Sequence, residues 1–502
     1  MGTKNKKLHG LFPNLLFLLL AGAVLFFSAC AVGPKYQRPS APVPAAYKEA
    51  PPATSQEAGN WKPSQPSDGA AKGKWWEIYN DPALNALEEQ VSVSNQNVLA
   101  AEAQYREARD AVRIARSGLF PTVTADPSIV ESQSSRTATS GTTANLSTAP
   151  RTAYNLPIDF TYVADLWGSI HRSVTASAAA AQLSAAQLEN ARLSLQAELA
   201  VDYFQLHGSD GDHDLLDRTV KSYQEYLTLT QNRYNGGIAS GGDVAQAETQ
   251  LHTARAQLID LGESRAQFEH AIAILTGKPP ADLSIPLVPL NATPPPIPAG
   301  VPSALLERRP DIAGAERQMA AANEQIGIAQ AAYYPTLTLS ASGGLESGRF
   351  LRWFSWPSRF WSVGPQLAET LFDAGRRRAQ TDQARAAFDA TVANYRQTVL
   401  TGFQQVEDNL AALRVLSDEA QAEDDAVKAA QRSLQISSDQ YKAGTVSYLQ
   451  VITTQAIALQ DERTAVDIQT RRMVASVLLV QALGGGWDAS KLPSKQDLVS
   501  GK

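Results

Sequence analysis

The residues that could carry out chemistry are few and scattered along this chain of 502 residues. It contains six histidines and a single cysteine, Cys30. His207 and His213 have no partners at the spacing of metal ligands, and one cysteine can form neither an internal disulfide nor a zinc cluster. No nucleophile elbow, phosphate-binding loop or dinucleotide fingerprint is present. These observations argue against an enzyme, and we expect no metal site.

Cys30 is the residue with the clearest chemical role. Three lysines precede an apolar run over residues 15–27, and small residues lead to Cys30. This order is typical of a signal peptide, here residues 1–29. An uncleaved membrane anchor over residues 11–29 is the alternative, although Pro13 and Asn14 interrupt its apolar run. Cys30 is similar to the acylated cysteine of bacterial lipoproteins, where Ala31 implies delivery to the outer membrane; an incidental thiol is the other interpretation.

The pattern of the chain after residue 30 predicts long helices interrupted by short strands. Residues 30–82, rich in Pro, Ala, Ser and Gly, are predicted to form a lipidated tether. Helical periodicity follows over residues 83–118, and Pro121 ends it. Alternation with a period of two then predicts a β-hairpin over residues 121–164. The helical pattern returns over residues 166–235, about 105 Å at about 1.5 Å per residue. We expect residues 208–211, which begin and end with glycine, to interrupt this helix and bend it.

The same order of elements occurs twice. "IARSGLFPTVT" at 114–124 matches "IAQAAYYPTLT" at 328–338, and "YNGGIASGGDV" from Tyr234 matches "YKAGTVSYLQV" from Tyr441. Such matches indicate an internal duplication. Each repeat holds a helix, a β-hairpin and a long helical hairpin. The predicted boundaries are 83–278 for the first repeat, 279–302 for a Pro-rich linker, 303–486 for the second repeat with its β-hairpin at 335–371, and 487–502 for a C-terminal tail.

The predicted strands need partners outside the chain. Four strands in two separated hairpins cannot close a barrel, and exposed strand edges must be covered or shared. A group of aromatic residues mixed with Arg352 and Arg359 suits a girdle at a membrane interface; a buried aromatic mini-core is the alternative. The girdle residues are Trp353, Phe354, Trp356, Phe360 and Trp361. The net charge of −6 without a basic stripe argues against nucleic-acid binding.

Several motifs together resemble one family. They are "CAVGPKYQRP", "KWWEIYNDPALNAL", "RYNGGIASGGDVAQAET", "LLERRPDIAGAERQMAAANEQIGIAQAAYYPTLTLS", "LFDAGRRRAQ" and "YKAGTVSYLQV". They cover nearly the whole chain after residue 29, in order, and they resemble the TolC/OprM-like outer-membrane factors of the NodT-type lipoprotein branch. The resemblance implies a mainly α protein with membrane β-strands. Three chains would pool four strands each into a twelve-stranded β-barrel continuous with a long α-helical barrel.

The resemblance also implies a function and its partners. A homotrimer in the outer membrane would extend into the periplasm and act as the exit duct of a tripartite efflux system. It would meet a periplasmic adaptor and an inner-membrane pump of resistance-nodulation-division type, and export small molecules such as drugs. No cofactor is implied beyond the lipid on Cys30. The alternatives are the duct of a type I protein secretion system and a periplasmic coiled-coil scaffold lipoprotein without a pore.

The resemblance implies that the two glycine turns form the periplasmic tips that contact the adaptor and gate the pore. The residues concerned are Tyr234, Gly237, Asp243, Tyr441 and Gly444. Tyr441 and Asp243 would belong to ties between protomers, although simple helix packing is an equal interpretation for Tyr441. Gln450 and Thr453 occupy positions that are commonly acidic, which argues against a cation-binding ring. Residues 308–311 are expected to form a structural cap.

Overall fold

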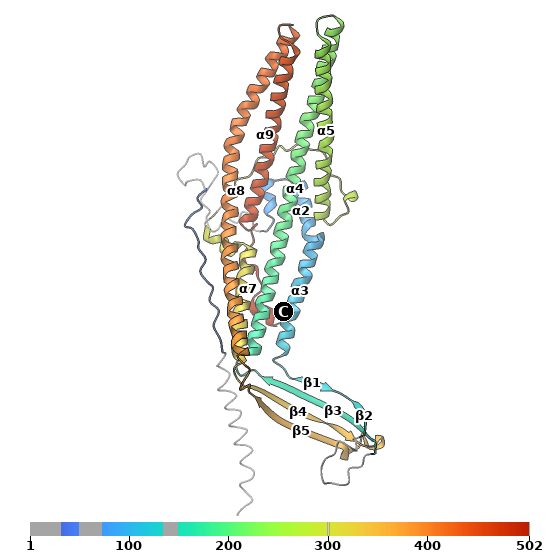
Figure 1. The fold of residues 1–502 in the computed structure, drawn as a ribbon, viewed down its shortest axis with the longest axis vertical. Helices are drawn as coiled ribbons and strands as arrows, with labels where there is room; N and C mark the ends of the chain where they lie inside the picture. Colours follow the sequence, from blue (N-terminus) through green and yellow to red (C-terminus); the bar gives the residue numbers. More distant parts are fainter. Residues whose placement is uncertain (1–31, 50–72, 134–148, 299, 301, 501–502) are drawn as a thin grey trace, which may run out of the picture.

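The protein is an elongated layer of helices with a β-sheet at one end (Figure 1). The computed structural model describes residues 32–49, 73–133, 149–298, 300 and 302–500. The predicted signal peptide and Cys30 lie outside the described residues. Within the described ranges, no helix combines the length and the hydropathy needed to cross a bilayer.

The long helices confirm the internal duplication. The first repeat contains α4 (Ser169–Asn235) and α5 (Gly241–Leu275), and the second contains α8 (Arg376–Lys442) and α9 (Tyr448–Ala482). α4 and α8 have 67 residues each, and α5 and α9 have 35 each. A glycine with positive φ directly precedes each 67-residue helix: Gly168 precedes α4 and Gly375 precedes α8. The two copies therefore agree in element length as well as in sequence.

The predicted interruption at residues 208–211 is wrong, because α4 is continuous through these glycines. A Cβ atom on Gly208 would lie 2.3 Å from Oγ1 of Thr470, and one on Gly211 would lie 3.3 Å from Cγ1 of Val466. Both neighbours belong to α9. These glycines therefore allow α4 and α9 to approach closely, and packing rather than bending explains them.

The shorter helices are more divided than predicted. The stretch 83–118 forms α2 (Pro82–Ser94) and α3 (Gln96–Ser117), because Asn95 is extended and its Oδ1 accepts hydrogen bonds from the backbone N–H groups of Asn97 and Val98. The stretch 303–332 likewise breaks at Arg309 into α6 (Leu305–Arg308) and α7 (Pro310–Ala331). Proline at the first position of α7 favours this start.

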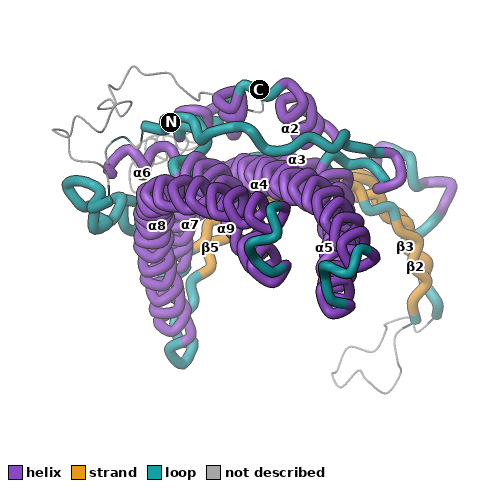
Figure 2. Tube along the Cα trace, turned by 90° about the horizontal axis from the view of Figure 1, so that it is seen from above, coloured by secondary structure: helices purple, strands orange, loops and turns teal. Residues whose placement is uncertain are grey.

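The helices form a curved row. Seen along the long axis, α8, α9, α4 and α5 lie next to one another (Figure 2). α7 fills the space between α8 and α4 at the sheet end, and α3 packs on the other side of α4. The main core lies at the middle of the layer, around Trp75, Phe204 and Tyr395, which are at most 2% exposed.

The strands form one sheet rather than two separated hairpins. β1 (Thr122–Ala125) and β2 (Ser128–Ser132) both pair with β3 (Arg151–Ala164), which pairs with β4 (Thr336–Ser347), and β4 pairs with β5 (Arg359–Ala368). All pairs are antiparallel. The first predicted strand is interrupted at Asp126-Pro127, since proline lacks the N–H that a ladder needs. The pairing of β3 with β4 joins the two repeats.

The segments predicted as tether, linker and tail pack on the helices where they are described. Residues 32–49 run along α8, where Tyr47 is 5% exposed and the Glu407 carboxylate accepts from the backbone N–H groups of Lys48 and Glu49. The linker buries Ile285 and Ile297. At the C-terminus, α10 (Lys495–Ser500) packs against α3 and α4. These segments therefore cover the helical layer from its middle to the end that carries the sheet.

Candidate functional site

The two turns that join the long helices lie together at the end of the molecule remote from the sheet (Figure 1). Gly237 and Gly444 adopt φ values of +74° and +79°, and no atom lies within 4 Å of a Cβ built on Gly237. Tyr234 is 52% exposed beside the first turn. The turns therefore present backbone and a few large apolar side chains, Tyr234, Ile238 and Leu449, to the surroundings. Their reversal depends on glycine.

Asp243 has a local role in this structure. Its Oδ2 accepts hydrogen bonds from the backbone N–H and the hydroxyl of Ser240, each at 2.9 Å. The Ser240 Oγ in turn accepts from the Asp243 backbone N–H at 3.1 Å. This is a capping box at the start of α5. Within one chain, Asp243 thus satisfies the helix end.

Tyr441 connects the two helical hairpins within the chain. It is 3% exposed, and its hydroxyl lies 3.0 Å from Oγ1 of Thr230 on α4. Arg233 donates a hydrogen bond of 2.6 Å to the Tyr441 carbonyl, and its guanidinium lies 4.6 Å from the centre of the Tyr441 ring. The Tyr441 ring also packs against Tyr448 on α9. These contacts form an intramolecular tie between the end of α4 and the end of α8.

Arg233 is the main residue of the tip that sequence reasoning missed. It directly precedes Tyr234 of the repeated motif, and the matching residue before Tyr441 in the second repeat is Gln440. This asymmetry between the copies is the signal that could have identified it. A charged side chain present in one copy alone cannot be explained by the shared fold of the repeats.

A buried polar network lies at the middle of the helical layer. Asp210 is 0% exposed, and its carboxylate accepts hydrogen bonds from Arg265 Nε at 2.7 Å, the Val288 backbone N–H at 3.0 Å and His207 Nδ1 at 3.1 Å. Burial alone would raise the pKa of Asp210, but hydrogen bonds from His207, the Val288 N–H and Arg265 outweigh it and lower the pKa. The network attaches the linker to α4 and α5.

The residues 308–311 form the structural cap that was expected. The Arg309 guanidinium pairs with both carboxylate oxygens of Asp311, at 3.0 and 2.6 Å. Its Nη1 also donates to the carbonyl of Ala482 at the end of α9, at 2.8 Å. The motif therefore joins the start of α7 to the last helix. Within the described ranges, no cluster of three or more histidines and acidic residues could hold a metal ion.

The sheet has one apolar and one polar face. Residues paired across antiparallel strands share a face, so the register aligns Phe160 with Ala341 and Val363, and Thr161 with Ser340. The exposed apolar residues on the first face are Val123, Ile129, Ile158, Phe160, Leu339, Trp361, Val363 and Leu367. Strands with this alternation can separate lipid from water.

The predicted aromatic girdle is partly wrong. Trp356 and Trp361 are 76% and 78% exposed, and Phe354 is also exposed. Trp353 is buried because its ring packs on Tyr154 and Phe354, and its Nε1 donates to the Leu345 carbonyl. Phe360 lies on the polar face, since it is adjacent to Trp361 and successive strand residues alternate. Three of the five residues therefore remain available to an interface.

Comparisons with known proteins agree with this architecture. The family described as "Outer membrane efflux protein" matches residues 87–278 and 301–485. An antibiotic efflux pump outer membrane protein, ArpC of Pseudomonas putida, is 33% identical over 479 residues, covering 94% of this chain and 95% of that protein. The toluene efflux pump outer membrane protein TtgC, also of Pseudomonas putida, has the same identity and coverage.

A solved structure shows the same fold. The outer-membrane channel OprN superposes with a TM-score of 0.81 at 29% identity, covering 91% of this chain and 100% of that one. A helical layer continued by a two-faced sheet is thus the architecture of an outer-membrane channel protein. The chain belongs to the outer membrane efflux protein family. It is located in the outer membrane and the periplasm, and serves as an outer-membrane exit duct.

Proposed function

We propose that this protein is a homotrimeric duct through which a tripartite efflux system exports small molecules by passive conduction, without catalysing a reaction. The observation that carries the proposal is the incompleteness of the single chain. The β1/β2 edge and the β5 edge of the sheet have no partner strand among the described residues. The helical row is likewise curved and open at both sides (Figure 2). Both features call for further copies of the chain.

Three copies satisfy both requirements. Each chain supplies four strand positions, with β1 and β2 sharing one. Twelve positions fall within the range of closed membrane barrels, whereas four cannot close. The apolar sheet face would meet lipid and the polar face would line the lumen. The curved helical rows of three copies would complete a tube that continues the lumen into the periplasm.

The proposed partners follow from the relatives and from the tips. ArpC and TtgC are named as components of an antibiotic and a toluene efflux pump. We therefore propose an inner-membrane pump of resistance-nodulation-division type, a periplasmic adaptor, and cargo that consists of small organic molecules. The exposed turns around Gly237 and Gly444 are the proposed adaptor contact, and the tie between Arg233 and Tyr441 is part of the proposed gate.

The experiment that tests the trimeric duct combines mass and conductance. Full-length protein purified from outer membranes in mild detergent should have the mass of a trimer and should conduct ions in planar bilayers. A monomer that is silent in the bilayer would overturn the proposal. A trimer without conductance would favour the scaffold alternative and would also contradict a duct.

A lipid on Cys30 is also proposed, and the position of the neighbouring residues supports it. Val32 donates its backbone N–H to the Trp167 carbonyl, where β3 gives way to α4. Gly33, with φ of +115°, lies so close to α7 that a Cβ would be 2.6 Å from the Gly327 Cα. Because Val32 is held where the sheet meets the helices, an acyl chain two residues earlier would reach the periplasmic leaflet.

Replacing Cys30 with alanine is expected to abolish metabolic labelling with palmitate. The reason is that no other cysteine exists to accept the acyl chain. The measurement is autoradiography of the immunoprecipitated full-length protein, with Ser28→Ala as a matched control that retains labelling. If palmitate label persists in C30A, the lipid is attached to a residue other than Cys30.

Bulky substitutions at Gly237 are expected to impair adaptor docking while leaving the trimer intact. Gly237 has open space around it, so a leucine there costs about 1–2 kcal/mol for its positive φ and creates no clash. The measurement is cross-linking to the adaptor together with drug susceptibility of cells. Gly262→Leu, also in open space but within α5, is the matched control. Unchanged cross-linking and export in G237L would contradict the tip assignment.

A further inference from the structure

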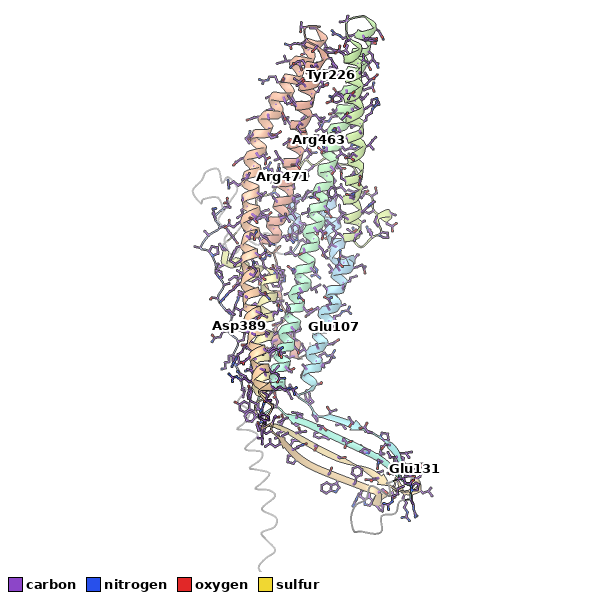
Figure 3. The ribbon with its side chains drawn as sticks, in the orientation of Figure 1. Glu107, Glu131, Tyr226, Asp389, Arg463 and Arg471 are labelled. Atoms are coloured by element: carbon purple, nitrogen blue, oxygen red, sulfur yellow. The ribbon has the colours of Figure 1, made fainter. Side chains whose placement is uncertain are left out.

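The segment between β4 and the start of β5 carries three arginines that form no ion pair with the described residues. Residues 348–363 contain Arg349, Arg352 and Arg359 and no acidic residue. None of these three arginines forms an ion pair with a described carboxylate. Glu131 lies at the same distal end of the sheet, at the end of β2 (Figure 3), without pairing with them. A cluster of free guanidinium groups favours an anionic partner.

The loop folds onto the apolar face of the sheet. The rings of Phe350 and Trp353 pack against Tyr154, with centroids 5.7 and 5.5 Å apart. Tyr154 and Ile129 are paired across β3 and β2, and Tyr154 shares its face with Ile158 and Phe160 by alternation. The loop that carries Arg349 and Arg352 therefore packs on the apolar face, which is the face proposed to meet lipid. Arg359 lies on the same face because it pairs with Leu345.

Exposed apolar side chains lie in the same loop as the arginines. Leu351, Phe354 and Trp356 are 97%, 68% and 76% exposed, and Arg359 lies with Cζ 4.2 Å from the centre of the Trp356 ring. Arg359 is paired with Leu345 and precedes Trp361 by two residues, so it continues the apolar face. Aromatic rings beside cationic groups are typical of the lipid headgroup region, where rings insert and charges meet phosphate.

Hydrogen bonds within the loop support its conformation. The hydroxyls of Ser355 and Ser358 both donate to the Arg352 carbonyl at 2.6 Å, within two short 3-10 turns. A preformed loop loses little conformational freedom on binding. The backbone at Arg352 is therefore held in a defined conformation.

The position of the loop in the membrane indicates which lipid its arginines would meet. The helices extend into the periplasm from the opposite end of the strands, so this loop lies at the outer leaflet (Figure 1). The abundant anionic groups of that leaflet are the phosphates of its glycolipid. We propose that Arg352 and Arg359, with Arg349, bind the phosphate groups of the outer-leaflet glycolipid, while Phe354, Trp356 and Trp361 insert beside its acyl chains. This surface rests on the outer-membrane location and adds a ligand to it.

The test measures binding of lipid A to the full-length protein purified in zwitterionic detergent. The probes are diphosphorylated lipid A and the same lipid without phosphates, followed by native mass spectrometry and tryptophan fluorescence. The double variant R352Q/R359Q should bind diphosphorylated lipid A roughly 30-fold more weakly, the effect of two surface arginines at an anionic membrane. R106Q/R432Q removes two exposed arginines from the helices and should bind like the wild type. R352K/R359K should retain part of the affinity because the charge is kept.

Two results would overturn the inference: equal affinity of the wild type for both lipids, or equal affinity of R352Q/R359Q and wild type for the phosphorylated lipid. Planar-bilayer conductance of the same preparations separates this inference from the proposed duct. Phosphate-dependent binding by a protein that does not conduct would sustain the lipid site and contradict the duct. A protein that conducts ions but binds both lipids equally would support the duct and contradict the lipid site.

Discussion

Replacing Asp210 with alanine is expected to lower the free energy of unfolding by about 3–5 kcal/mol, because it leaves buried hydrogen-bond donors without their acceptor. The carboxylate accepts from Arg265, His207 and the Val288 N–H, and it is 0% exposed. Arg265 would keep only its bond to the Ile285 carbonyl and its weaker approach to Glu269. Chemical unfolding followed by circular dichroism in detergent measures the change.

Asp214→Ala provides the matched control on the same helix. Its carboxylate pairs with Arg218 at 3.2 Å, but its side chain is 48% exposed. Exposed pairs contribute at most about 1 kcal/mol. If D210A and D214A lower the unfolding free energy by the same small amount, the network is not a major source of stability.

The Asp210 effect should depend on pH in one direction. Because the folded-state pKa of Asp210 is lowered, its stabilisation is present above the unfolded-state pKa of about 3.9 and is lost as pH falls further. The difference in unfolding free energy between the wild type and D210N should therefore be constant near neutral pH and shrink below about pH 4. A difference that grows on acidification would contradict the lowered pKa.

Replacing Arg233 with alanine is expected to shift the tips towards an open state. The substitution removes the 2.6 Å hydrogen bond to the Tyr441 carbonyl and the stacking over the Tyr441 ring. At this partly exposed position the two contacts together contribute about 2 kcal/mol. The ratio of open to closed channels should then rise roughly 30-fold, measured as open probability in planar bilayers.

Arg255→Ala is the matched control for this experiment. Arg255 donates to Gln224 at 2.9 Å and so joins α5 to α4 within one hairpin, without reaching α8. Its loss should leave the open probability unchanged. R233K should give an intermediate value, since lysine keeps the charge but loses the planar stacking group. Equal open probability in R233A and the wild type would show that the contact between Arg233 and Tyr441 does not keep the channel closed.

Local pattern explains what could be predicted about this architecture. Helix period, strand alternation, Pro121 and the turn glycines are properties of short segments, and their repetition revealed two copies with equal helices. The same local reasoning misassigned Gly208, because a glycine that bends a helix and one that admits a neighbour look alike in sequence. It also grouped Trp353 with exposed aromatics, although Tyr154 on β3 and the neighbouring Phe354 help to bury it.

The sequence by itself determined the order of the elements, the duplication, the alternation of the strands and the two glycine turns, because each depends on neighbours along the chain. Only the tertiary structure decided which polar groups meet. Arg233 and Tyr441 are separated by 208 positions, and Asp210 and Val288 by 78. Such contacts depend on how two long helices and a linker align in space, which no periodicity encodes. For the same reason, the basic and aromatic surface between β4 and β5 depends on the packing of this loop against Tyr154 of β3.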